Sequence, residues 1–175
     1  MTHPKIYQSL FILPLILLML GAYYLFLPKP SAPQLNFRTI NNQLVNLKQL
    51  QGQPVLITFW ASNCPSCLKE IVHFKSLYQD YHAHGLEIIA IAMQYDRPNY
   101  VVAAAKNHQI PYHIVLDLHG QFAQSFGDIR LTPTTLLINP QGNIEYQITG
   151  LFDLQAMQKR IESLLKNNTT SSLTL

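Results

Sequence analysis

The sequence predicts an α/β protein of three layers, with a mixed central sheet that helices cover on both faces. The first reason is the order of segments: apolar strand-like runs alternate with helix-like runs over residues 55–116. The second is a hairpin signal, Asn-Pro-Gln-Gly, followed by a last amphipathic segment. Parallel strands joined by helices, with antiparallel strands at one end, form a mixed sheet. With 175 residues, the chain has room for one such domain and not for two.

The N-terminal part predicts a membrane anchor. Residues 1–9 form a short head, and residues 10–27 are 18 residues without a charge. As a helix this segment spans about 27 Å, close to the hydrocarbon thickness of a bilayer. A cleaved signal peptide is the alternative, but it needs small residues at a cleavage site, and the Pro-Lys-Pro-Ser-Ala-Pro that follows has no such pattern. We therefore expect an uncleaved, single-pass transmembrane helix, with the bulk of the chain exported.

The rest of the chain divides into a linker, a domain and a tail. Residues 28–34 are proline-rich and predict a stiff spacer between the anchor and the domain. Residues 35–166 form the folded domain, and residues 167–175 are predicted to be a polar, flexible tail. Apart from Lys5 and Lys29, which flank the anchor, ten basic residues stand against nine acidic ones, and no basic patch indicates a nucleic-acid partner.

The first elements of the domain are a hairpin and a buried strand. Residues 35–40 and 43–46 are predicted to pair around an Asn-Asn turn. Residues 47–51 predict one helical turn that ends at Gly52. Residues 55–60, Val-Leu-Ile-Thr-Phe-Trp, are almost continuously apolar, which is typical of a strand covered on both faces.

The remaining elements follow from apolar periodicity. Residues 68–81 carry an apolar stripe at helical spacing, so they predict a helix, which ends near Gly85. Residues 86–93 are a second buried strand. The other predicted helices are 99–108, 121–126 and 154–165, and the other predicted strands are 113–116, 134–138 and 143–149.

Both cysteines lie in one motif between the first buried strand and the helix after it. Cys64 and Cys67 are separated by Pro65 and Ser66. Unpaired N–H groups and the helix dipole favour a thiolate in the first turn, and the thiolate is the attacking species. The position of Cys64 therefore predicts a nucleophile. Cys67, one turn later, is predicted to resolve the mixed disulfide that Cys64 forms.

The cysteine pair has three other interpretations. A purely structural disulfide closing so small a ring adds little stability by chain entropy. Closed zinc coordination needs four ligands, and no second pair has the right spacing; His82 and His84 are predicted to be solvated on the surface. A copper carrier with two thiolates and one histidine remains an alternative, because soft ligands suit Cu(I).

Two segments carry a resemblance to a known family. Phe-Trp-Ala-Ser-Asn-Cys-Pro-Ser-Cys at residues 59–67, with Leu-Thr-Pro-Thr-Thr-Leu-Leu-Ile at 131–138 and Gly142, resemble the thioredoxin fold. Within that fold the chain is similar to the membrane-anchored TlpA/ResA/CcmG-like thiol-disulfide oxidoreductases. The resemblance covers about residues 35–166, including an insert at 94–112 that this branch carries.

The resemblance implies roles for further residues. Pro133 is expected to be cis and to lie against the cysteines, where Thr132 would present its backbone to a substrate strand; an ordinary trans proline is the alternative. Glu70 occupies a position where family members often carry an acid. It is expected to raise the pKa of the thiols and to relay protons. The alternative is a solvent-facing glutamate that complements the helix dipole.

Trp60 is expected to shield the disulfide, and a core position is the alternative. The predicted substrate-contacting residues are Trp60, Pro65, Thr132 and Pro133. The chain departs from the family pattern at Thr58 and at Asn63. Thioredoxin itself has a buried aspartate near the position of Thr58, so Glu70 is a candidate to replace that proton relay.

The resemblance leads to a functional expectation. We expect a thiol-disulfide oxidoreductase in a bacterial inner membrane, with its domain in the periplasm or on the outer face. It is expected to reduce disulfides of exported proteins such as apocytochrome c, with electrons from a membrane thiol donor and with no cofactor or metal. The second departure, Asn63 where the family often has tryptophan, leaves the partner and the potential open.

Two other functions remain alternatives. A peroxiredoxin-like peroxidase would carry Thr or Ser three residues before the reactive cysteine, where this chain has Ala61. A Sco-like copper-delivery module would separate its cysteines by one more residue. The direction of electron flow and the client protein stay undecided by the sequence.

Overall fold

The computed structural model describes residues 14, 16–19, 21 and 29–172. The chain divides into two units, Met1–Pro30 and Ser31–Leu175. Among the described residues, no helix is both long enough and apolar enough to cross a membrane. Most of the predicted anchor at 10–27, and all of the head at 1–9, lie outside the described residues.

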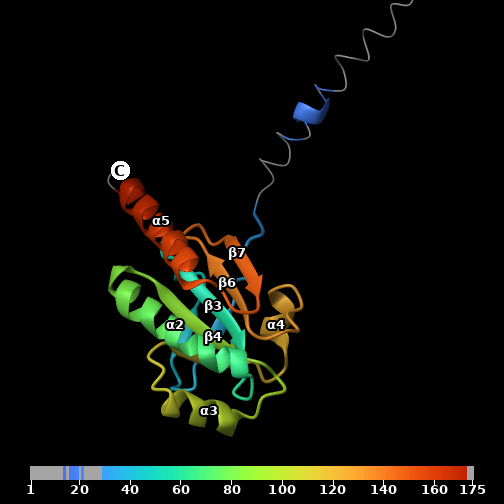
Figure 1. Cartoon of the computed structure of the whole chain (residues 1–175), viewed down its shortest axis with the longest axis vertical. Coiled ribbons are helices and arrows are strands. Elements are labelled where there is room, and N and C mark those ends of the chain that lie inside the picture. The colour runs from blue at the N-terminus through green and yellow to red at the C-terminus, as the bar shows by residue number, and fades with distance from the viewer. Residues whose placement is uncertain (1–13, 15, 20, 22–28, 173–175) are drawn as a thin grey trace, which may run out of the picture. The chain divides into compact units, whose positions relative to one another are not determined.

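A five-stranded mixed sheet forms the centre of the second unit, with strand order β5-β4-β3-β6-β7 (Figure 1). Strands β3, β4 and β5 are parallel, β6 is antiparallel to β3, and β7 is antiparallel to β6. This arrangement confirms the predicted mixed sheet. The strands are β3 Val55–Trp60, β4 Glu87–Ala92, β5 His113–Leu116, β6 Thr134–Ile138 and β7 Ile144–Thr149.

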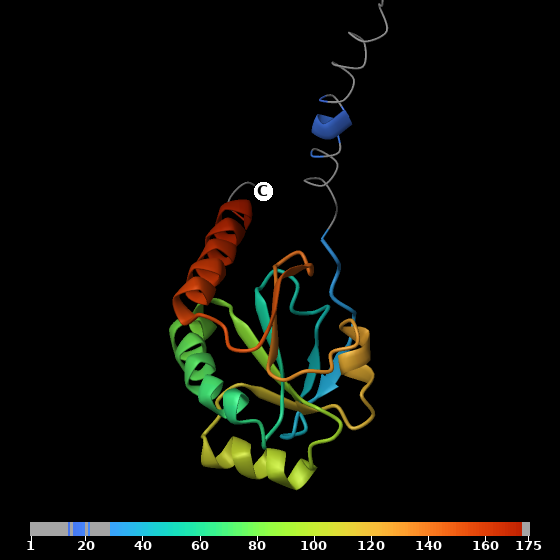
Figure 2. The ribbon, with the colours of Figure 1, turned by 45° about the vertical axis from the view of Figure 1, so that its right-hand side comes forward.

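Helices and a hairpin cover the two faces of this sheet. Apolar residues of α2, α3 and α5 pack on one face. Those of α4 and of the hairpin β1–β2 pack on the other, so α2 and α5 lie across the sheet from α4 (Figure 2). The three predicted layers are therefore present. The elements are β1 Asn36–Arg38, β2 Leu44–Asn46, α2 Pro65–Tyr81, α3 Pro98–Asn107, α4 Gln121–Ser125 and α5 Leu154–Ser172.

The position of β3 in the middle of the sheet explains why its sequence is apolar at nearly every position. Leu56 and Trp60 belong to the core under α2, whereas Ile57 and Phe59 belong to the core under α4. All six residues of the strand are buried. Since successive side chains point to opposite faces, a strand in the middle layer must be apolar on both.

Three predicted boundaries differ from the structure by three residues or more. Helix α2 begins at Pro65 rather than at residue 68, because proline fits the first turn, where its missing N–H is not needed. Helix α5 continues to Ser172, into the segment predicted as a flexible tail, since no glycine or proline interrupts it. The contacts of the domain begin before residue 35: the Ala32 N–H donates to the Gly142 carbonyl at 2.9 Å.

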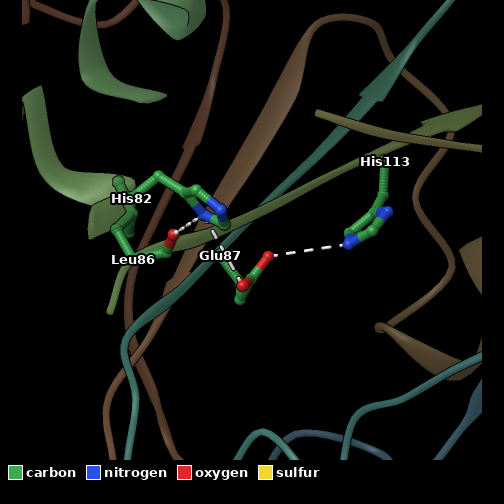
Figure 3. A network of polar contacts seen from close by, with 4 residues as sticks. All are labelled: His82, Leu86, Glu87 and His113. Atoms are coloured by element: carbon green, nitrogen blue, oxygen red, sulfur yellow. Dashed lines mark hydrogen bonds and ion pairs between the residues drawn. The ribbon is translucent and has the colours of Figure 1, made fainter. Parts of the chain in front are cut away.

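His82 and His84 are both exposed, which confirms the prediction of surface histidines. His82 also has polar partners in the chain. Nδ1 of His82 lies 3.1 Å from the Leu86 carbonyl oxygen and 3.6 Å from the Glu87 carboxylate (Figure 3). Nε2 of His113 lies 3.6 Å from the other oxygen of the same carboxylate. Glu87 therefore sits between two imidazoles at the start of β4.

The hairpin is anchored by Phe37, whose side chain is fully buried and meets the Phe122 ring edge-on at 4.9 Å between centroids. We predict that Phe37→Ala lowers the free energy of unfolding by about 3–5 kcal/mol, because it leaves a cavity between the hairpin and α4. Urea unfolding measures this loss. Leu44→Ala in the same hairpin is the control: Leu44 is exposed, so we expect a change within about 0.5 kcal/mol. Equal effects of the two substitutions would contradict the anchoring role.

Candidate active site

The two cysteines form a disulfide at the N-terminus of α2. The Sγ–Sγ distance is 2.22 Å and the Cα atoms are 5.2 Å apart. Cys64 is the N-cap residue, and its Sγ accepts the Cys67 N–H at 3.2 Å. Ser66 Oγ lies 3.3 Å from the same sulfur. The Cys67 N–H thus donates to Cys64 Sγ, and the Ser66 hydroxyl is close enough to donate as well, which favours a thiolate there once the bond is reduced.

The two sulfurs differ in access. Cys64 is half-buried, whereas Cys67 is 3% exposed and belongs to the core under α2. A disulfide partner can therefore reach Cys64 and not Cys67. This difference agrees with the predicted roles of nucleophile and resolving cysteine.

The segment before β6 lies beside the disulfide. The Thr132–Pro133 peptide bond is cis, so the trans alternative is wrong. Pro133 is buried and lines the same small cavity as Cys67. Thr132 is half-buried, and its Oγ1 lies 3.3 Å from Oη of Tyr95. The structure thus brings the two sequence motifs together, although more than sixty residues separate them in the chain.

Glu70 is fully buried, so the prediction of a solvent-facing glutamate is wrong. Its Oε1 accepts the Phe152 N–H at 3.0 Å, and Oε2 has no hydrogen-bond partner. Burial raises the pKa of Glu70 from 4.5 to about 7, and the Phe152 hydrogen bond opposes part of that rise. Near neutral pH this carboxyl group is therefore able both to take up and to release a proton.

A small cavity joins Glu70 to the resolving cysteine. Its volume is about 10 Å³, close to the space that one water molecule needs. Two buried polar atoms without a partner, Glu70 Oε2 and Trp60 Nε1, belong to residues that line it. The residues around the cavity include Thr58, Trp60, Cys67, Glu70, Tyr112 and Pro133. The acid therefore occupies the space beside Thr58 where the resemblance implied a missing aspartate.

The residues predicted to contact substrate separate into two groups. Pro65 is exposed and Thr132 is half-buried, so both are accessible to a partner. Trp60 is 3% exposed and packs in the core with Cys67, which corrects the expectation that its ring contacts substrate. Pro133 is buried too, and bounds the cavity rather than the outer surface.

Sequence reasoning missed four residues around the site. Phe152 supplies the N–H to Glu70, and Tyr112 lines the cavity; burial, and then the Glu70 charge, raise the pKa of Tyr112. Neither residue stands in a pattern that would have drawn attention. Tyr95 and Asp96 contact the loops on either side of the disulfide. Asp96 was detectable in principle, because it closely follows a buried parallel strand, where polar groups of a site gather.

Comparisons with known proteins agree with this geometry. A family model described as redoxin matches residues 29–165. The thiol-disulfide oxidoreductase ResA of Halalkalibacterium halodurans is 32% identical over 124 residues, which are 70% of this chain and 69% of that protein. The chain belongs to the redoxin family, on its ResA-like branch. This redoxin is a thiol-disulfide oxidoreductase whose redox pair is Cys64 and Cys67.

Two further proteins resemble this redoxin, one in sequence and one in fold. The thiol-disulfide oxidoreductase ResA of Bacillus subtilis is 28% identical over 141 residues, covering 81% of this chain and 77% of that protein. The crystal structure of a thiol:disulfide interchange protein from Chlorobium tepidum superposes with a TM-score of 0.73 at 21% identity. It covers 79% of this chain and 98% of that one. This structural likeness shows that the fold is shared.

The raised pKa of Glu70 predicts a pH-dependent stability. Between pH 4.5 and about 7 the folded chain holds a proton on Glu70 that the unfolded chain releases, so stability falls as pH rises through this window. A shift of this size corresponds to about 3 kcal/mol. We expect the difference in unfolding free energy between the oxidised wild type and Glu70→Gln to change by up to that amount, as measured by urea unfolding.

The control for this series is Glu162→Gln, which changes an exposed acid on α5. Its stability should run parallel to that of the wild type across the same pH range. A Glu70→Gln curve that is also parallel to the wild type would show that the Glu70 carboxyl group titrates alike in both states.

Proposed function

We propose that this redoxin is an exported, membrane-tethered reductase of protein disulfides, of the kind that serves cytochrome c maturation. The observation that carries the proposal is the asymmetric redox pair: an accessible Cys64 and a buried Cys67, with Glu70 in the same cavity as Cys67. Such a pair accepts a protein disulfide at one sulfur and completes the exchange with the other.

The first step is attack by the Cys64 thiolate on a client disulfide. A bond forms between Cys64 Sγ and one client sulfur, the client disulfide breaks, and the second client sulfur leaves as a thiolate that takes a proton. The client chain would lie along the segment at Thr132, which is half-buried and precedes β6, and pair with its backbone as an extended strand.

The second step uses Cys67 and Glu70. The Cys67 thiol gives its proton to the Glu70 carboxylate, and its sulfur attacks Cys64 Sγ. The intramolecular disulfide forms, the mixed disulfide breaks, and the first client sulfur leaves as a thiolate and is protonated. In total the client gains two electrons from this chain and two protons. The Cys64 proton passes to solvent when its thiolate forms, and Glu70 releases the Cys67 proton to solvent or to the leaving sulfur. A carboxyl group whose pKa is about 7 is matched to this transfer near neutral pH.

Reduction is the direction that the charges favour. A dithiol whose thiolate is strongly stabilised is a strong oxidant, because its reduced form is stable. Here the residues between the cysteines, Pro65 and Ser66, carry no charge, and the buried Glu70 disfavours a thiolate on Cys67. The hydrogen bonds at Cys64 Sγ favour a thiolate, whereas the acid beside Cys67 opposes one, and the proposal takes the second effect as the larger, so that the reduced pair donates electrons.

In this proposal the electrons come from a thiol protein in the membrane. The apolar segment at residues 10–27 would tether the domain to a bacterial inner membrane, with the domain on its outer side. A membrane thiol protein would return the Cys64–Cys67 disulfide to the dithiol. The ResA relatives, which are thiol-disulfide oxidoreductases, support the same reaction type.

Substitution of each cysteine tests the order of events. With insulin as client, Cys64→Ser should abolish disulfide reduction by the purified full chain, because the accessible nucleophile is gone. Cys67→Ser should instead accumulate a mixed disulfide between Cys64 and insulin, visible by mass spectrometry without reductant. Full activity of the Cys64→Ser chain would overturn the proposal, and trapping on Cys67 in that chain would reverse the two roles.

The reduction potential of the pair tests the direction. Equilibration of the full chain against a dithiol buffer should give a reduction potential close to that of thioredoxin, which is about −270 mV. A value near the about −120 mV of a strong oxidant would mean that the protein inserts disulfides into its clients. In that case the cytochrome-maturation role would be wrong, while thiol-disulfide exchange would stand.

A further inference from the structure

The loop after β4 contacts both loops that enclose the disulfide. Asp96 accepts two hydrogen bonds from Ser62, one from its N–H to Oδ2 and one from its hydroxyl to Oδ1 at 2.7 Å. The neighbouring Tyr95 reaches the other side, where its Oη lies 3.3 Å from Thr132 Oγ1. Two consecutive residues thus link the loop that carries the nucleophile to the loop that precedes β6.

The sheet explains why these three loops meet. Strands β3 and β4 are parallel neighbours with Trp60 opposite Ala92, so the chain leaves both at the same edge. Strand β6 is antiparallel to β3 and begins there, with Thr134 opposite Phe59. Ser62, Asp96 and Thr132 each lie within four residues of these strand ends.

The contact at Ser62 lies in the turn that leads to the nucleophile. Cys64 closes a turn through its N–H to the Ala61 carbonyl at 3.1 Å, and Ser62 lies within that turn. The Asp96 N–H is itself fixed to the Met93 carbonyl at 2.9 Å. The carboxylate therefore ties the cysteine turn to the end of β4, which belongs to the rigid sheet.

Asp96 contacts a single residue of the cysteine turn through both of its oxygens, which accept hydrogen bonds from the Ser62 N–H and hydroxyl. This paired contact suits it to hold the turn in position. The Glu70 carboxyl group, by contrast, lines the cavity with Cys67.

We propose that Asp96 and Tyr95 are positioning residues of the exchange reaction. Asp96 acts through Ser62 to hold the turn of Cys64. Tyr95 acts through Thr132 to hold the segment along which the client would lie at a fixed distance from that turn. A protein disulfide needs both elements in register, because a displacement of about 1 Å at a reacting centre lowers rates by up to about a hundredfold. A small reagent needs only the sulfur. The inference rests on the exchange reaction and not on its direction or its natural client.

The test compares two reactions of the reduced full chain. One is the exchange with insulin disulfides, and the other is alkylation of Cys64 by iodoacetamide at about pH 9, where the thiol is largely ionised. For Asp96→Ala we expect insulin exchange to fall by about tenfold and alkylation to change by less than about twofold. Urea unfolding shows that each variant is folded under the assay conditions.

The conservative variant separates geometry from charge. Asp96→Asn keeps an oxygen to accept the Ser62 N–H and an N–H to donate to the Ser62 hydroxyl, but removes the charge. We expect it to exchange with insulin within about twofold of the wild type. Equal losses in Asp96→Ala and Asp96→Asn would overturn the positioning role in favour of a charge effect. An unchanged Asp96→Ala, or an alkylation rate that falls as far as the insulin rate, would overturn it outright.

Two milder variants keep the test decisive if Asp96→Ala does not fold. Ser62→Ala removes only the hydroxyl bond, and Tyr95→Phe removes only the contact to Thr132. Each should lower insulin exchange by about twofold to fivefold and leave alkylation unchanged. Tyr100→Phe is the matched control, since this exposed tyrosine contacts Arg97 and neither loop. If both milder variants behave like this control, the proposal is wrong. A wild type that fails to reduce insulin would instead overturn the proposed function.

Discussion

The hydrogen-bonded ladders on both sides of β3 are the constraint on which the site depends. Because β3 pairs in parallel with β4 and antiparallel with β6, two strand ends and one strand start meet at one edge of the sheet. The cysteine motif leaves β3 at that edge, and Pro133 leads into β6 beside it. A slip of one residue in either ladder would turn every side chain of β3 to the other face. The full burial of the strand opposes such a slip.

The buried carboxyl group of Glu70 places a group that titrates near neutral pH beside the resolving cysteine. Glu70 satisfies one oxygen with the Phe152 N–H and leaves the other without a partner beside the cavity. An ionised carboxylate is costly in such a place, and the protonated form is not. The group therefore titrates near neutral pH, where a thiol must be deprotonated to react. Tyr112 lines the same cavity, and its raised pKa keeps it a neutral hydroxyl there.

The two sulfurs differ in access and in burial, which suits them to different roles. Cys64 stands at the surface end of α2 within reach of polar hydrogens, whereas Cys67 lies one turn deeper, against the core and the acid. In the proposed reaction the outer sulfur meets the client, whereas the inner sulfur is buried away from solvent. The loop with Tyr95 and Asp96 adds a mechanical link around this pair, because it touches both walls of the site.

The sequence by itself determined the strands, most of the helix bounds, the redox pair and the loop at Pro133, because each of these is written in local periodicity or in a contiguous motif. Only the tertiary structure decided that Glu70 is buried: its helical position is compatible with either side, and its partner Phe152 lies 82 residues away. The bond between Ser62 and Asp96 joins loops 34 residues apart. Such contacts depend on how distant loops pack at a sheet edge, and no local pattern encodes that packing.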